Sequence, residues 1–154
     1  MLDPLVKTIE VPCGQAKAFA VFIEGMGGWW PVEKFSVSAM AKSTVKELRV
    51  EARKGGTIVE VSADGTENDW GLIRVYEPPS FLSMDFHFVP PGEPRGAVTL
   101  VEVRFTALAD DRTRVELTQS NWEALGERAE GIRGGYDFGW GMIFEQAYKA
   151  ACGG

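Results

Sequence analysis

The chain has 154 residues, of which 45% are hydrophobic and 25% are charged, and this length and composition predict one soluble globular domain. Its 16 basic residues against 22 acidic ones give a formal net charge of −6, which disfavours nucleic acid or an anionic membrane as a partner, because both require a basic surface. The longest apolar run, residues 18–23, is too short to cross a bilayer, and the N-terminus has no signal-peptide pattern, so a cytoplasmic protein is expected.

Cysteine and histidine are too sparse to predict a metal site or a hydrolytic triad. Cys13 and Cys152 lie near opposite ends of the chain without a Cys-x-x-Cys pair, and we expect them to be free structural thiols. His87 is the one histidine, and we expect it to be exposed or simply hydrogen-bonded. Since the chain also lacks a phosphate-binding glycine loop and a dinucleotide fingerprint, no metal and no cofactor is expected.

The N-terminal part predicts a strand, a helix and an irregular connection. Residues 5–11 alternate as in a strand, and residues 15–24 repeat their apolar positions at helical spacing. Three glycines then stop the helix before Trp29 and Trp30, two adjacent side chains that cannot both point the same way. Residues 32–43 show no clean period, so we interpret them as a connection within the domain.

From residue 44 onward, apolar residues alternate with polar ones at the period of a strand. Short turns rich in glycine, proline and aspartate separate the segments, so consecutive hairpins should form an antiparallel meander with one apolar face. Alternation leaves open whether Ile58 and Glu60 or Val59 and Val61 face inward. The predicted strands are residues 45–51, 57–62, 69–76, 81–88, 97–107 and 113–119.

A long helix is predicted over residues 121–151, because its apolar residues fall on one broad stripe. Glycines at five positions oppose it, since each costs about 0.5–1 kcal/mol relative to alanine, and they indicate close approach to a sheet or space beside Tyr136 and Trp140. This helix is long enough to cover the sheet, which predicts an α+β, two-layer domain over residues 1–154. Its residues Tyr136, Trp140 and Phe144 should face the sheet, whereas Phe138 and Met142 should not.

Glycine, tryptophan and proline recur in a fixed order along the chain. The central series is Ala52-Arg53-Lys54-Gly55-Gly56, Glu60, Gly65, Trp70-Gly71, Glu77-Pro78-Pro79 and Leu82, and the flanking motifs are Trp29-Trp30-Pro31 and Gly139-Trp140. These motifs resemble those of the START-like (SRPBCC) superfamily, in the branch of the activator of heat shock protein 90 ATPase. The resemblance implies a helix-grip fold, in which a curved antiparallel sheet of about seven strands wraps around a long C-terminal helix and a hydrophobic cavity, with two short helices after the first strand.

The candidate site is this implied cavity, since apolar walls with a few polar groups are typical of small-molecule sites; the alternative is a tightly packed core. Glu60 and Trp70 lie on adjacent predicted strands, where carboxylate and indole N–H could meet, and Glu60 would either bind a cationic or hydroxylated ligand, act as an acid or base, or face solvent. The predicted ligand-binding residues are Phe19, Trp29, Trp30, Glu60, Trp70, Phe86, Phe88, Trp122, Tyr136, Trp140 and Phe144.

Three functions remain open, and binding is favoured over catalysis. The first is a module that binds a hydrophobic or aromatic small molecule between the C-terminal helix and the sheet. The second is a chaperone-associated regulator of the heat shock protein 90 ATPase, prompted by the resemblance and by an acidic surface suited to a protein partner. The third is a cyclase- or dehydratase-like enzyme in which Glu60 or Tyr136 transfers protons. No feature of the sequence indicates the oligomeric state.

Overall fold

Seven segments with alternating apolar and polar residues form one antiparallel sheet in the computed structural model, which describes residues 2–88 and 98–153. The strands are β1 (Leu5–Val11), β2 (Val45–Val50), β3 (Thr57–Ser62), β4 (Glu67–Glu77), β5 (Phe81–Phe86), β6 (Thr99–Ala109) and β7 (Arg112–Ser120). Their order across the sheet is β1-β7-β6-β5-β4-β3-β2, so consecutive strands from β2 to β7 pair with each other, and β1 pairs with β7.

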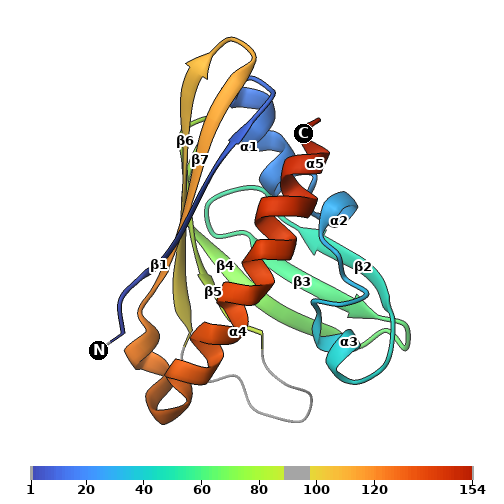
Figure 1. The fold of residues 1–154 in the computed structure, drawn as a ribbon. Helices are drawn as coiled ribbons and strands as arrows, with labels where there is room; N and C mark the ends of the chain where they lie inside the picture. Colours follow the sequence, from blue (N-terminus) through green and yellow to red (C-terminus); the bar gives the residue numbers. More distant parts are fainter. Residues whose placement is uncertain (1, 89–97, 154) are drawn as a thin grey trace.

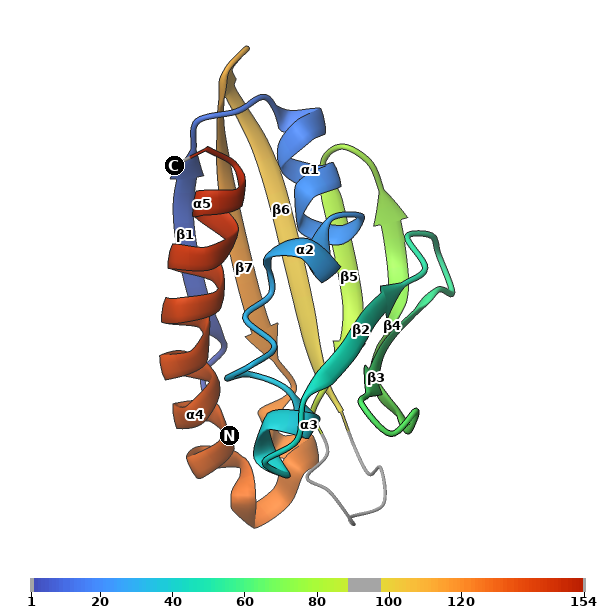
Figure 2. The same ribbon diagram turned by 90° about the vertical axis from the view of Figure 1, so that its right-hand side faces the viewer.

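The sheet curves around a C-terminal helical segment, with β1 and β7 on one side of that segment and β2 and β3 on the other (Figure 1). Three short helices also lie inside the curve (Figure 2). The predicted helix-grip fold is therefore confirmed. The helices are α1 (Gln15–Ile23), α2 (Met26–Trp29) and α3 (Val37–Met40) before β2, and η1 (Trp122–Arg128), α4 (Ala129–Met142), η2 (Ile143–Tyr148) and α5 (Lys149–Ala151) after β7.

The C-terminal helical segment follows one path but is not uniform. Its first part, η1, is a 3-10 segment that is kinked at Gly126, where φ is 66°. The middle part, η2, is π-helical, so its turns are wider than those of α4 before it. Neither departure from α-helical geometry was visible in the stripe of apolar residues that predicted the helix. Of the helices in the described ranges, none has the length and apolarity that a membrane span requires.

Helix α3 lies within the stretch that we interpreted as a connection, and it adds a third short helix to the two expected after β1. The side chain of Ser36 caps it by accepting a hydrogen bond from the Ala39 amide at 3.0 Å. The carboxylate of Glu60 accepts from the Val37 and Ser38 amides at 2.8 and 2.6 Å. Because Glu60 lies on β3, far from α3 in the chain, no local period in the sequence could reveal this helix.

On β5, β6 and β7, alternate apolar residues are buried on the concave face of the sheet: Leu82, Met84, Phe86, Val101, Val103, Phe105, Val115 and Leu117. On β3, Ile58 and Glu60 are fully buried, which decides the choice that alternation left open. On β4, Ile73 is buried but Val75 is only half-buried, because the pairing with β5 shifts register between these two residues.

Trp140, Phe144 and Phe138 take the faces of the C-terminal helix that were predicted for them, whereas Met142, predicted to face away from the sheet, is half-buried. Trp140 is buried and packs against Phe86 of β5 with ring centroids 5.9 Å apart, and Phe144 is fully buried. Phe138, on the opposite arc, is 67% exposed. Further along, the Tyr148 hydroxyl donates to the Ala18 carbonyl at 2.7 Å and so joins the end of the helix to α1.

Cys13 and Cys152 are both buried and unpaired, which confirms the expectation of free thiols. Burial raises the pKa of the Cys152 thiol above its ordinary value. It therefore stays protonated at neutral pH, and a protonated thiol is a poor nucleophile.

Replacing Gly134 with alanine should stabilise the protein. Gly134 is exposed on α4, and an added Cβ would meet no atom within 4 Å. Because alanine is favoured over glycine in a helix interior, we expect the free energy of unfolding to rise by about 0.5–1 kcal/mol in urea denaturation followed by circular dichroism. Gly126→Ala is the control with the opposite expected sign: it should lower the free energy of unfolding, since a positive φ disfavours alanine there. A less stable Gly134→Ala protein would contradict the prediction.

Candidate functional site

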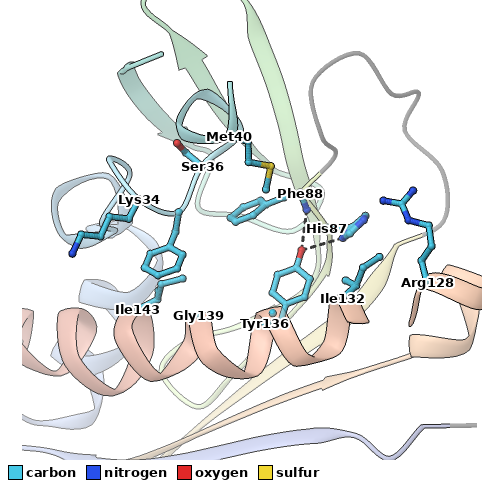
Figure 3. A pocket seen from close by; sticks show the side chains of 12 residues that line it. Lys34, Ser36, Met40, His87, Phe88, Arg128, Ile132, Tyr136, Gly139 and Ile143 are labelled. Carbon is cyan, nitrogen blue, oxygen red and sulfur yellow. Dashed lines mark hydrogen bonds between the residues drawn. The ribbon is translucent and has the colours of Figure 1, made fainter. Parts of the chain in front are cut away.

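A cavity of about 260 Å³ lies between the C-terminal helix and the segment that leads into α3 (Figure 3). Most of its wall is apolar. The two residues with permanently charged side chains, Lys34 and Arg128, lie at opposite ends in the view of Figure 3, and no carboxylate of the described residues lines it. The lining residues are Lys34, Phe35, Ser36, Met40, His87, Phe88, Arg128, Ile132, Gly135, Tyr136, Gly139 and Ile143.

Two glycines form part of the helical wall. Gly135 and Gly139 are four residues apart and therefore lie on the same side of α4. A Cβ added at Gly135 would meet nothing within 4 Å, and one added at Gly139 would contact the Phe35 ring at 3.7 Å. Because glycine has no side chain, helix backbone forms this part of the cavity wall. The sequence offered two reasons for the glycines of this helix, close approach to a sheet or space beside Tyr136 and Trp140, and the cavity agrees with the second.

The opposite wall depends on the buried carboxylate of Glu60. Its Oε1 accepts hydrogen bonds from the Val37 amide at 2.8 Å and from Nε1 of Trp70 at 2.8 Å. Its Oε2 accepts from the Ser38 amide at 2.6 Å and from the Ser38 hydroxyl. Glu60 and Trp70 meet as predicted, but all four donors are protein groups, and together they fix α3 against the sheet. The part of the wall that α3 contributes is therefore positioned by Glu60, which does not line the cavity itself.

The polar part of the wall is a group formed by Tyr136, His87 and Phe88. The Tyr136 hydroxyl oxygen lies 3.0 Å from Nδ1 of His87 and accepts from the Phe88 amide at 2.9 Å (Figure 3). The direction of the contact with His87 depends on which imidazole nitrogen carries the proton. Tyr136 comes from α4, whereas the other two residues follow the last position of β5, so this group joins helix and sheet at the cavity.

A second polar network holds the aromatic layer behind the cavity. The fully buried Gln119 accepts from Nε1 of Trp140 at 2.8 Å and donates to Thr99 at 2.8 Å. Its backbone carbonyl accepts from Nε1 of Trp122 at 3.0 Å. Within the described residues, no buried side-chain nitrogen or oxygen lacks a hydrogen-bond partner, so the indole donors of this layer are used for structure.

The predicted ligand-binding residues fall into three places. Phe88 and Tyr136 line the cavity. A layer of aromatic rings behind it, with Glu60 beside Trp70, contains Trp30, Trp70, Phe86, Trp122 and Trp140. The remaining three, Phe19, Trp29 and Phe144, lie where α1 meets the sheet and the end of the C-terminal helix. Phe19 packs on Phe105, Trp29 on Tyr148, and Phe144 on Phe22. For residues outside the lining, contact with a ligand stays a prediction.

Several lining residues were not among those predicted. Ile132 and Ile143 belonged to the apolar stripe of the helix, so their position was visible, but their contact with a cavity was not. Phe35 and Met40 lie in or beside α3, where the sequence has no period. His87 reaches Tyr136 across 49 positions of the chain, a separation that no local pattern reports. No group of three or more histidine, cysteine, aspartate or glutamate residues in the described ranges could hold a metal ion.

Solved structures share the fold. An anthrahydroquino-gamma-pyrone synthase, Txn09, is 28% identical over 88% of each chain, with a TM-score of 0.59. The self-sacrificing resistance protein CalC from Micromonospora echinospora is 24% identical, covers 97% of this chain and 93% of its own, and has a TM-score of 0.70. A protein from Nitrosomonas europaea is 17% identical, covers 96% and 92%, and has a TM-score of 0.65. No curated protein matches the chain.

A family model supports the resemblance that the sequence motifs indicated. The model described as activator of Hsp90 ATPase homolog 1-like protein matches residues 17–150, which include every helix and strand from α2 to η2. Together with the helix-grip architecture, this places the chain in the START-like (SRPBCC) superfamily. The chain therefore belongs to the family of activator of Hsp90 ATPase homolog 1-like proteins.

Proposed function

We propose that this protein binds a hydrophobic or aromatic small molecule in the cavity between the C-terminal helix and α3. The observation that carries the proposal is the apolar cavity with helix backbone exposed at Gly135 and Gly139. Small-molecule sites combine apolar walls with a few placed polar groups, and the Tyr136 group supplies these here. The volume of about 260 Å³ lies slightly below the range of about 300–1,000 Å³ usual for drug-sized ligands, so the ligand should be compact.

The pyrone synthase at 28% identity supports an aromatic ligand, because its name describes a product with fused rings. A ring placed in the cavity would remove water from the Phe35 and Phe88 side chains and from its own faces, at about 25 cal/mol for each Å² of apolar surface buried. Native mass spectrometry of freshly purified protein is the direct test. A retained aromatic molecule would identify the ligand; a protein without bound ligand whose melting temperature no hydrophobic compound raises would contradict the proposal.

Filling the cavity from the helix should weaken ligand binding. Leucine at position 135 would project into the open space beside Tyr136, so we expect Gly135→Leu to raise the dissociation constant of the fluorescent probe 1-anilinonaphthalene-8-sulfonate about tenfold or more. Gly134→Leu is the matched control, because it makes the same change on the same helix but outside the cavity. Equal effects of the two substitutions, measured by fluorescence titration, would show that the probe binds elsewhere.

A second candidate, a cyclase- or dehydratase-like enzyme, is favoured by one observation. The Tyr136 hydroxyl and Nδ1 of His87, which can exchange a proton, lie 3.0 Å apart at the cavity. Of the two acid–base residues proposed from the sequence, Tyr136 is therefore better placed than Glu60, whose carboxylate is occupied by four donors. His87→Gln should remove turnover at saturating substrate, where a change in affinity does not affect the rate; unchanged turnover would exclude this mechanism.

The family description also supports a regulator of the heat shock protein 90 ATPase. The acidic net charge of −6 suits a protein partner with a basic surface. A pull-down and an ATPase assay with the purified chaperone test this function independently of the cavity, since Gly135→Leu should leave a protein–protein effect unchanged. Absence of both binding and ATPase stimulation would remove this candidate.

A further inference from the structure

The polar groups of the cavity are concentrated at the Tyr136 end, and this distribution bears on what the ligand must carry. The Tyr136 hydroxyl is held by the Phe88 amide at 2.9 Å and by Nδ1 of His87 at 3.0 Å. The two partners, a side chain and a backbone amide, come from residues that directly follow β5. The hydroxyl oxygen is therefore fixed in position before a ligand arrives. A ligand oxygen placed beside this hydroxyl would join a hydrogen-bonded group that is already oriented, which lowers the entropy cost of binding.

The ring of Tyr136 is as firmly held as its hydroxyl. It lies 6.4 Å from the Trp140 ring at an interplanar angle of 23°, and 5.9 Å from the Trp122 ring. Nε1 of each of these tryptophans is in turn bonded to Gln119. The tyrosine therefore cannot turn away from the cavity without disturbing a buried network, so its hydroxyl is a fixed feature of the wall.

The shape of the cavity limits the ligand in a second way. Gly135 leaves helix backbone as one wall, because an added Cβ would meet nothing within 4 Å there, whereas Gly139 is already covered by the Phe35 ring, 3.7 Å from where its Cβ would lie. Since glycine has no side chain, a flat ring can approach the helix backbone closely at Gly135. A planar face against Gly135 and an oxygen toward Tyr136 are compatible, because both residues line the cavity.

We infer that the cavity selects planar aromatic molecules that bear an oxygen substituent, a phenol hydroxyl or an aryl carbonyl, with the ring against the helix backbone at Gly135 and the oxygen at Tyr136 and His87. This inference rests on the proposed binding function and names the chemical class of its ligand. The hydrogen bond selects the oxygen, and the glycine wall selects the planar ring.

Three compounds of similar size separate these two requirements in equilibrium dialysis. 2-Naphthol is planar and has a hydroxyl, 2-methylnaphthalene is planar without an oxygen, and 2-decalol has the hydroxyl on a puckered ring. A net hydrogen bond of about 0.5–1.5 kcal/mol corresponds to about three- to tenfold in affinity, so wild-type protein should bind 2-naphthol tighter than 2-methylnaphthalene by that factor. 2-Decalol should bind at least about threefold more weakly than 2-naphthol.

The substitution Tyr136→Phe should bring the affinity for 2-naphthol down to that for 2-methylnaphthalene and leave the latter unchanged. Tyr76→Phe is the matched control, since Tyr76 packs on Phe19 away from the cavity and should leave all three affinities unchanged. If Tyr136→Phe is unstable, His87→Gln tests the same group from its other side and should reduce the preference for 2-naphthol.

The possible failures are distinguishable. Equal wild-type affinities for the three compounds, or a preference for 2-naphthol that survives Tyr136→Phe, would overturn the inference and leave the cavity as a less selective apolar site. If none of the three compounds binds wild-type protein, the proposed binding function itself is contradicted, and the inference falls with it.

Discussion

Replacing Glu60 with alanine should lower the free energy of unfolding by about 3–5 kcal/mol, because it removes the acceptor of four buried hydrogen bonds. The Val37 and Ser38 amides and the Trp70 indole would lose their partner, and each unsatisfied buried donor costs about 1–3 kcal/mol. The cavity should be lost as well, since Phe35 and Met40 are carried by the segment that Glu60 holds. Urea denaturation and probe titration measure the two effects.

Glutamine at the same position gives a sharper version of this test. Both carboxylate oxygens of Glu60 face backbone N–H groups, so either orientation of the glutamine amide would set its NH₂ group against a donor. We therefore expect Glu60→Gln to be destabilised as well, although less than Glu60→Ala. Glu67→Ala is the control on the neighbouring strand, because its ion pair with Arg49 is exposed and should be worth about 0–1 kcal/mol. A Glu60→Ala protein as stable as Glu67→Ala would contradict this account.

Replacing Trp140 with alanine is the second large effect that we expect, at about 3–5 kcal/mol of lost stability. Trp140 is 2% exposed and its ring contacts Trp30, Phe86 and Tyr136, so its removal would leave a cavity in the middle of the aromatic layer. Trp140→Phe keeps most of the volume but leaves Oε1 of Gln119 without the indole donor, which should cost about 1–3 kcal/mol.

The matched control for Trp140 lies two positions earlier on the same helix. Phe138 is 67% exposed, and Phe138→Ala should change the free energy of unfolding by about 0.5 kcal/mol or less. Circular dichroism is the suitable readout, since removing a tryptophan alters the fluorescence of the protein directly. Similar losses for Trp140→Ala and Phe138→Ala would mean that the aromatic layer does not contribute to stability in the way proposed.

Regular periods explain why most of the fold could be predicted. Residues 5–11 and 57–62 were predicted as strands, and the strands β1 and β3 have these bounds. Where pairing is irregular, the sequence was less informative. Val75 alternates in step with Ile73, which predicts that both face inward, but the shift of register between them turns Val75 partly outward. A bulge changes the face of a side chain without changing the apolar or polar pattern that predicts the strand.

The motif Trp70-Gly71, which contributed to the family resemblance, has a physical explanation in the structure. A Cβ at Gly71 would lie 2.2 Å from the carbonyl oxygen of Asp85, so glycine is required for β4 and β5 to approach each other. Trp70, beside it, donates to Glu60 at 2.8 Å. One residue of the pair thus permits the close pairing of two strands, and the other secures the carboxylate that positions α3.

The candidate site was harder to predict than the fold because long-range contacts create it. Aromatic residues are abundant throughout the core, so their type alone could not separate Tyr136, which lines the cavity, from Trp140, which lies behind it. The pair of Tyr136 with His87 and the attachment of α3 to Glu60 join segments 49 and 23 positions apart. Such contacts follow from the curvature of the sheet, which no period in the sequence encodes.

The π-helical segment η2 has a consequence for the phase of the aromatic series Tyr136, Trp140, Phe144 and Tyr148. In an α-helix of 3.6 residues per turn, each step of four residues advances by about 40°, so three steps would rotate the last ring about 120° away from the first. The wider turn of η2 takes up extra residues and reverses part of this drift, and Phe144 and Tyr148 are both fully buried, with ring centroids 5.7 Å apart. A single row of rings can therefore run along the helix from the cavity to α1, and a uniform α-helix with the same sequence would rotate its far end out of the core.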